Sequence, residues 1–165
     1  MSLPTLPTIR PMTTTDMEQV RRIYALGIAT RNATFETEVP AAEALHAKWI
    51  PAQRWVVELD GAVAGWAAMT PISARECYRG VGETSIYVDT ALAGRGLGRQ
   101  LLAHQVEAAF AGGFWTLQTS IFPENEASLA LHRKVGFRDV GRRERIAQLD
   151  GIWRDTILLE LRAPQ

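Results

Sequence analysis

The sequence predicts an α/β protein in which helices cover both faces of a single mixed β-sheet. Strand-like and amphipathic helical segments alternate along the 165 residues in the order βααβββαβαββ, and such alternation is typical of layered α/β architectures. An Asp60-Gly61 pair lies between two apolar runs and predicts a tight hairpin. A glycine-rich turn at residues 93–98 joins a predicted strand to a predicted helix.

The first half of the chain predicts one strand, two helices and a hairpin. Thr15 and Glu18 have capping-box spacing, so a helix is expected to begin there. Pro51 ends a second helical segment, because proline disfavours helical backbone in the residue before it. The polar segment between the two helices has no clean period and predicts a loop or a broken helix near a ligand. The expected elements are a strand at 8–10, a helix through about 24, a loop at 29–39, a helix at 41–49, and strands at 55–59 and 62–69.

The second half predicts two more strand–helix units and a closing pair of strands. Gly112 and Gly113 are expected to end the helix that follows the glycine-rich turn. Residues 115–121 are apolar and β-branched enough for a buried strand. The expected elements are a strand at 83–88, a helix to about 111, a strand at 115–121, a helix through 135, and strands at about 137–147 and 152–161.

The composition predicts one domain over residues 1–165, with a core from about 8 to 162. Hydrophobic residues make up 47% of the chain, which is enough for a substantial core. Basic and acidic residues both number 18, so no overall field attracts nucleic acid or an anionic membrane, and neither is expected as a partner. The single cysteine, Cys77, excludes an internal disulfide and suits a reducing compartment. No signal-peptide pattern opens the sequence, so a cytoplasmic protein is expected.

The glycine-rich turn is a candidate phosphate site because Gly94, Gly96 and Gly98 lie at every second position. Glycine permits positive φ and close backbone approach, so the amides of the turn can point at an anion. The dipole of the following helix and the charges of Arg95 and Arg99 would add to the attraction. The spacing fits neither a Walker A loop nor a dinucleotide fingerprint, which would need glycine in place of Arg99. A turn that only caps the helix is the alternative interpretation.

The turn resembles the pyrophosphate loop of the GNAT superfamily of N-acetyltransferases, whose pattern is Gln/Arg-x-x-Gly-x-Gly/Ala. Gly96 and Gly98 occupy its glycine positions, and Ala93 departs from the pattern at its first position. Residues 125–137 resemble a second segment of the same superfamily, Asn-x-x-Ala/Ser-x-x-Leu-Tyr/His-x-x-x-Gly-Phe. The resemblance implies a GNAT-type fold with a mostly antiparallel central sheet, and acetyl-CoA as co-substrate. The cofactor contacts that it implies are Ile86, Tyr87, Val88, Arg95, Gly96, Leu97, Gly98, Arg99, Asn125 and Ser128. For Asn125, the helix N-cap is an alternative role.

A closer resemblance extends from about residue 8 to 162. The blocks at 33–36, 57–65, 83–88 and 131–132 are similar to the phosphinothricin and methionine sulfoximine N-acetyltransferase family. That family acetylates the α-amine of glutamate-like or glutamine-like molecules, so the resemblance implies a small amino-acid acceptor, resistance to such compounds and a homodimer. An amino-acid acceptor needs a cation for its carboxylate and an apolar wall for its side chain. The candidate acceptor-binding residues are Phe35, Arg75, Tyr78 and Asn32.

The chemistry of amine acetylation gives roles to two residues. An amine at pH 7 is mostly ammonium and only its neutral form attacks a thioester, so the site needs a proton acceptor. Glu83 is the candidate general base, because it opens the strand that leads into the glycine-rich turn. An ion pair with Arg75 is its structural alternative. His132 could protonate the coenzyme A thiolate, act as a second base, or only hydrogen-bond a neighbour.

No metal site is expected, because His46 and His104 fall on predicted helix surfaces without other ligands at suitable spacing. Two other functions stay open at this point. One is acetylation of a polyamine, an aminoglycoside or a protein N-terminus, and the other is a non-catalytic acyl-CoA-binding module. The presence of Glu83 and His132 disfavours the module, since a protein that only binds needs no base.

Overall fold

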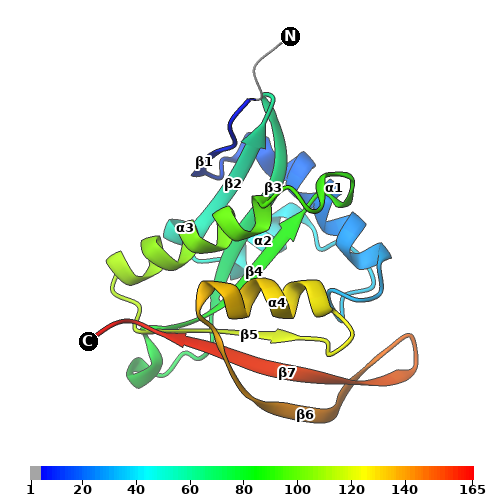
Figure 1. Ribbon diagram of the computed structural model, residues 1–165, viewed down its shortest axis with the longest axis vertical. Helices are drawn as coiled ribbons and strands as arrows, with labels where there is room; N and C mark the ends of the chain where they lie inside the picture. Colours follow the sequence, from blue (N-terminus) through cyan, green and yellow to red (C-terminus); the bar gives the residue numbers. More distant parts are fainter. Residues whose placement is uncertain (1–4) are drawn as a thin grey trace.

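The computed structural model describes residues 5–165, which form one seven-stranded sheet with the strand order β1-β2-β3-β4-β5-β7-β6 (Figure 1). Neighbouring strands run antiparallel except β4 and β5, which are parallel. The strands are β1 (Thr8–Pro11), β2 (Arg54–Leu59), β3 (Ala62–Pro71), β4 (Val81–Val88), β5 (Thr116–Ile121), β6 (Arg138–Leu149) and β7 (Ile152–Arg162). The main helices are α1 (Met17–Ala29), α2 (Ala42–Lys48), α3 (Leu97–Ala111) and α4 (Glu126–Val135). This order and the mostly antiparallel sheet confirm the predicted fold class.

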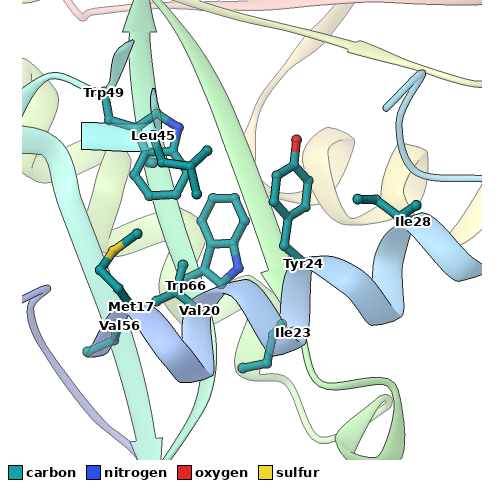
Figure 2. Close-up of a cluster of buried hydrophobic side chains, with 10 residues drawn as sticks. Met17, Val20, Ile23, Tyr24, Ile28, Leu45, Trp49, Val56 and Trp66 are labelled. Carbon is teal, nitrogen blue, oxygen red and sulfur yellow. The ribbon is translucent and has the colours of Figure 1, made fainter. Parts of the chain in front are cut away.

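The two faces of the sheet carry separate hydrophobic cores. Figure 1 shows α3 and α4 on the near side of the sheet and α1 and α2 on the far side. Because side chains alternate along a strand, Trp66 and Ala68 of β3 pack with α1 and α2, whereas Ala67 and Met69 pack beneath α3. Figure 2 shows side chains of both far-side helices gathered around Trp66. Strand β3 is therefore buried on both faces and supports its neighbour β4.

The hairpin and helix-end signals fold as the sequence predicts. Asp60 and Gly61 have φ values of 54° and 79°, as a type I′ turn requires at both central positions. Gly112 ends α3, and Gly113 follows it with a φ of 94°. Within residues 5–165, none of the helices has the length and apolar character needed to cross a membrane.

The start of the first helix differs from the prediction. The Asp16 carboxylate accepts the backbone N–H of Thr13 at 2.7 Å, so the cap lies at Thr13 and Asp16 and a 3₁₀ turn at Thr14–Asp16 precedes α1. The expected Thr15 and Glu18 box is therefore wrong. Arg10 of β1 also donates two hydrogen bonds of 2.8 Å to the Asp16 carboxylate and so ties the cap to the sheet.

The sheet opens between β4 and β5. These strands pair only from Val81 to Glu83 and from Thr116 to Gln118, and they diverge beyond that point, with α4 beside the opening (Figure 1). Strand β4 stays paired with β3 as far as Val88, and β5 stays paired with β7 to its end. The facing edges of β4 and β5 are consequently released from pairing, which leaves a notch in the middle of the sheet.

Candidate active site

The glycine-rich turn forms part of a groove of about 500 Å³ between β4, the start of α3 and α4. Gly94 and Gly96 have φ values of 80° and 76°, a conformation that glycine favours. A Cβ atom at either position would meet nothing within 4 Å, so glycine is needed there for backbone conformation. Gly98 is helical instead, and its Cβ would lie 3.3 Å from Leu131 of α4. The expected positive φ thus holds for two of the three glycines, while Gly98 permits the close approach of α3 and α4.

Backbone amides at the start of α3 face this groove without helical partners. The first intrahelical bond runs from the Gln100 N–H to the Gly96 carbonyl at 3.2 Å. The amides of residues 97–99 therefore have no acceptor within the helix, and such amides bind anions well. Arg99 lines the groove, whereas Arg95 is exposed and lies outside its lining. Of the two predicted arginines, only Arg99 is in position to add charge to the groove.

A second cavity, of about 290 Å³, lies on the β5 side of the notch and contains both candidate catalytic residues, Glu83 and His132. Its walls come from α1, the segment between α1 and α2, α2, β4, β5, α4 and β7. The groove and this acceptor cavity share the lining residues Ala33, Ile86, Tyr87, Asn125 and Ser128. A molecule in the groove can therefore reach one in the acceptor cavity at the exposed edge of β4.

Glu83 lies where the notch begins and is half-buried. Its carboxylate accepts one hydrogen bond, from Gln118 Nε2 of β5 at 3.1 Å. No ion pair joins it to Arg75 within residues 5–165, because the Arg75 guanidinium lies over the Tyr78 ring, 5.5 Å from its centre. An ionised carboxylate offers about four acceptor positions, so Glu83 retains the capacity to accept a proton from a bound ammonium.

The exposed edge of β4 presents alternate backbone amides to the notch. Asp89 donates its N–H to the Ala64 carbonyl at 2.8 Å, and residues along an antiparallel ladder alternate in direction. Tyr87 therefore pairs with β3, whereas the N–H groups of Ile86 and Val88 point to the opened side. The N–H of Val88, a predicted cofactor contact, therefore faces the notch, whereas the N–H of Tyr87 does not.

His132 is a buried residue of α4 whose ring packs edge-on against Phe137, with 5.2 Å between ring centres. Its Nδ1 lies 2.8 Å from the backbone carbonyl of Ser128. A carbonyl oxygen only accepts hydrogen bonds, so Nδ1 carries the proton and Nε2 of the neutral ring bears a lone pair. Burial lowers the pKa of His132 below 6.5. At neutral pH the ring is accordingly poised to accept a proton, not to donate one from Nε2.

A family model described as the acetyltransferase (GNAT) family matches residues 20–137. The chain belongs to the GNAT acetyltransferase family. It is 32% identical over 160 residues to phosphinothricin N-acetyltransferase of Alcaligenes faecalis, covering 93% of this chain and 81% of that protein. It is 31% identical over 160 residues to the L-methionine sulfoximine/L-methionine sulfone acetyltransferase of Pseudomonas paraeruginosa, covering 93% and 92%. A GNAT superfamily phosphinothricin acetyltransferase from Sinorhizobium meliloti, crystallised with acetyl-CoA, gives a TM-score of 0.85 at 28% identity over 94% of this chain and 88% of that one.

This GNAT acetyltransferase uses acetyl-CoA as its co-substrate, and the groove suits that molecule. The amides at the start of α3 and the Arg99 side chain provide donors for phosphate oxygens. Val88 and Leu131 give the groove an apolar stretch between that end and the notch. Within residues 5–165, no three His, Cys, Asp or Glu side chains gather closely enough to hold a metal ion.

Asn125 joins the two cavities. Its Oδ1 accepts the Ser128 N–H at 3.2 Å, which caps α4, and its Nδ2 donates to the Asn32 carbonyl at 3.0 Å. Asn32 in turn donates from Nδ2 to the Glu124 carbonyl at 3.3 Å. The cap role considered for Asn125 is therefore confirmed, and the same side chain holds the segment after α1 against α4.

The four candidate acceptor-binding residues do not come together. Phe35 lines the acceptor cavity and packs edge-on against Phe122, with ring centres 4.9 Å apart. Asn32 lines the groove instead. Arg75 and Tyr78 are exposed between β3 and β4 and line neither cavity. Within one chain, Arg75 is therefore not in position to bind an acceptor carboxylate in the acceptor cavity.

Sequence reasoning missed the charged side chains at the mouth of the acceptor cavity, Glu36 and Lys48. Lys48 belongs to the last turn of α2, where a cation is commonly explained by the helix dipole. No local pattern distinguishes such a lysine from a surface residue. The remaining two histidines are also placed differently than expected. His46 contacts the Arg54 guanidinium at 3.0 Å, and His104 packs on the Trp55 ring with 4.5 Å between ring centres. Both are half-buried.

Proposed function

We propose that this GNAT acetyltransferase transfers the acetyl group of acetyl-CoA to the α-amine of a small amino acid such as L-phosphinothricin or L-methionine sulfoximine. The observation that carries the proposal is the joining of the two cavities at β4, with Glu83 and His132 on the acceptor side. The names of the Alcaligenes and Pseudomonas relatives support this class of acceptor. The acceptor cavity, at about 290 Å³, is also of the size expected for a small ligand.

Glu83 acts as the general base in this proposal. Acetyl-CoA supplies the thioester carbonyl that the amine attacks. Glu83 removes a proton from the acceptor ammonium, which frees the nitrogen lone pair for attack. The backbone N–H groups of Ile86 and Val88 stabilise the negative charge that develops on the carbonyl oxygen. The new C–N bond then replaces the C–S bond, and direct transfer needs no acyl-enzyme.

His132 assists as a second proton acceptor. Its Nδ1 is occupied by the Ser128 carbonyl, so only Nε2 is available, and in the neutral ring that atom accepts. Ser128 Oγ lies 3.4 Å from His132 Nδ1, which keeps Ser128 beside both the imidazole and the groove. The proposal therefore assigns thiolate protonation to solvent and not to His132.

The test is steady-state thiol release from acetyl-CoA with L-methionine sulfoximine and L-phosphinothricin as acceptors. We expect Glu83→Gln to lower kcat roughly 100-fold or more, as for loss of a general base, while Gln118 can still donate to the new amide oxygen. Glu107→Gln, an exposed change on α3, serves as the matched control and should leave kcat unchanged. Turnover of neither amino acid by the wild-type enzyme would sink the acceptor assignment, and full activity of Glu83→Gln would sink the base.

We also propose that the chain, a single domain over residues 1–165, works as a homodimer in the cytoplasm. Four large apolar side chains of the β6–β7 hairpin are exposed, with Ile152 and Trp153 at 65% and 54%. Such a patch favours a protein–protein contact, and a second copy would cover it. Light scattering after size exclusion should give twice the chain mass, and Trp153→Ser should shift the protein to monomer. Leu6 is 82% exposed at the other end of the molecule, so Leu6→Ser should leave the protein dimeric. A monomeric wild type would refute the dimer.

A further inference from the structure

The lining of the acceptor cavity contains more acidic than basic side chains. Within residues 5–165 the lining includes the carboxylates of Glu36 and Glu83 but a single permanent cation, Lys48. His132 adds no charge at neutral pH, because burial lowers its pKa. The empty cavity therefore carries one more negative charge than positive.

Lys48 is free to bind a ligand anion. Its ammonium takes part in no ion pair within residues 5–165. The other cation near the cavity, Arg154, is already engaged. It donates to the Arg31 carbonyl at 3.0 Å, pairs with Glu124 at 3.2 Å and stacks on the Phe122 ring. Lys48 is consequently the available partner for a carboxylate.

Glu36 lies on the same cavity beside two phenols. Burial and then the Glu36 charge raise the pKa of Tyr24, and Glu36 also contributes to the raised pKa of Tyr87, for which burial is the main cause. The Tyr24 and Tyr87 rings are in edge-on contact, 4.9 Å between centres. The Glu36 carboxylate forms no ion pair in the described part of the chain, so its charge acts on whatever enters.

We propose that Lys48 and Glu36 select the acceptor by charge: Lys48 binds the α-carboxylate, and Glu36 disfavours a second negative charge on the acceptor side chain. This inference rests on the proposed amino-acid acetyltransferase function. An acceptor that is a zwitterion with an uncharged side chain satisfies Lys48 and Glu83 at once. An acceptor with an anionic side chain brings a further negative charge to a cavity with no second cation. The enzyme therefore prefers L-methionine sulfone, whose side chain is neutral, over L-phosphinothricin, whose phosphinate is ionised.

The experiment compares kcat/KM for these two amino acids in the wild type and two variants. Glu36→Gln should raise kcat/KM for phosphinothricin roughly 3- to 10-fold, as for removing one like charge at close range, and change the value for the sulfone by less than about twofold. Lys48→Met should raise KM for both about 10-fold, as for loss of one charge-assisted contact. L-methionine sulfone amide, which lacks the carboxylate, should be used equally by wild type and Lys48→Met.

Two control variants change exposed charged residues that do not line the cavity. Glu38→Gln removes an exposed carboxylate two residues from Glu36, and Lys134→Met removes the other lysine of the chain; neither should alter the acceptor ratio. If both amino acids are turned over and Glu36→Gln leaves the ratio of their kcat/KM values unchanged, charge selection by Glu36 is overturned while the proposed function stands. Equal losses with the acid and the amide in Lys48→Met would overturn carboxylate binding by Lys48. Turnover of neither amino acid by the wild type would overturn the proposed function, and this inference with it.

Discussion

The cofactor groove and the acceptor cavity meet at the exposed edge of β4, yet they are built in different ways. The phosphate end of the groove comes from one short run of chain, in which Gly94, Gly96 and the first amides of α3 present backbone groups. The acceptor cavity depends on side chains brought together from three helices, the segments beside them and three strands. Phosphate recognition can therefore be encoded in a short local segment, whereas acceptor specificity is a product of packing and can change independently.

The largest expected effect is on acetyl-CoA binding in the groove. Gly96→Ala forces a side chain onto a φ of 76°, which costs about 1–2 kcal/mol and shifts the amides that follow. We expect the KM for acetyl-CoA to rise about 10- to 100-fold, as for weakening a charge-assisted hydrogen bond, with the acceptor KM unchanged.

Gly151→Ala is the matched control for that change. Gly151 has a φ of 78° and open space around its Cβ position, but it belongs to the turn between β6 and β7. Thermal unfolding should detect a similar loss of stability in both variants. If the two raised the KM for acetyl-CoA equally, global strain would explain the effect and the local encoding of the groove would be refuted.

A smaller effect is expected on the acceptor side, at His132. Because burial holds its pKa below 6.5, the ring is neutral at pH 7 and gains a proton as the pH falls. If Nε2 accepts a proton in the reaction, kcat/KM of the wild type declines as the pH falls through the pKa of His132. His132→Asn should lower kcat/KM about 10-fold at pH 7.5 and remove the part of the decline that belongs to His132. A decline that instead begins at high pH would indicate that His132 acts as an acid.

The smallest effect on catalysis is expected from Asp16, which stabilises the far side of the molecule from both cavities. Arg10 lowers the pKa of Asp16 from 3.8 to about 2, so this contact stabilises the fold above pH 3.8 and the contribution is lost as the pH falls toward 2. Asp16→Asn should reduce the free energy of unfolding by about 1–3 kcal/mol and leave kcat unchanged.

Asp139→Asn is the comparison for Asp16 in denaturant unfolding. Asp139 also receives two hydrogen bonds from one arginine, Arg133, but its side chain is 43% exposed. Exposed pairs contribute little to stability, so its loss should be clearly smaller. Equal losses would show that burial of the Asp16 contact does not matter.

The order of the elements and the phosphate end of the groove can be predicted from the sequence alone. Period-2 and helical patterns are local, and a turn such as Asp60-Gly61 is decided by the φ values its own residues allow. The same holds for Gly96 and for Asn125, whose cap follows from its place before α4. Chain chemistry also singled out Glu83 and His132, which do share one cavity.

The charges of the acceptor cavity, by contrast, depend on tertiary packing. At the first helix the observed cap uses Thr13 and Asp16, which have the same local spacing as the predicted pair, and Arg10 of β1 ties that cap to the sheet. Lys48 carries no local signal, and the block at 33–36 does not reveal that Glu36 lines the acceptor cavity, while the candidate Arg75 lies over the Tyr78 ring outside both cavities. The physical reason is that the residues lining the acceptor cavity come from segments far apart in the chain, so their meeting depends on how β4 and β5 diverge and how the helices pack around the opening.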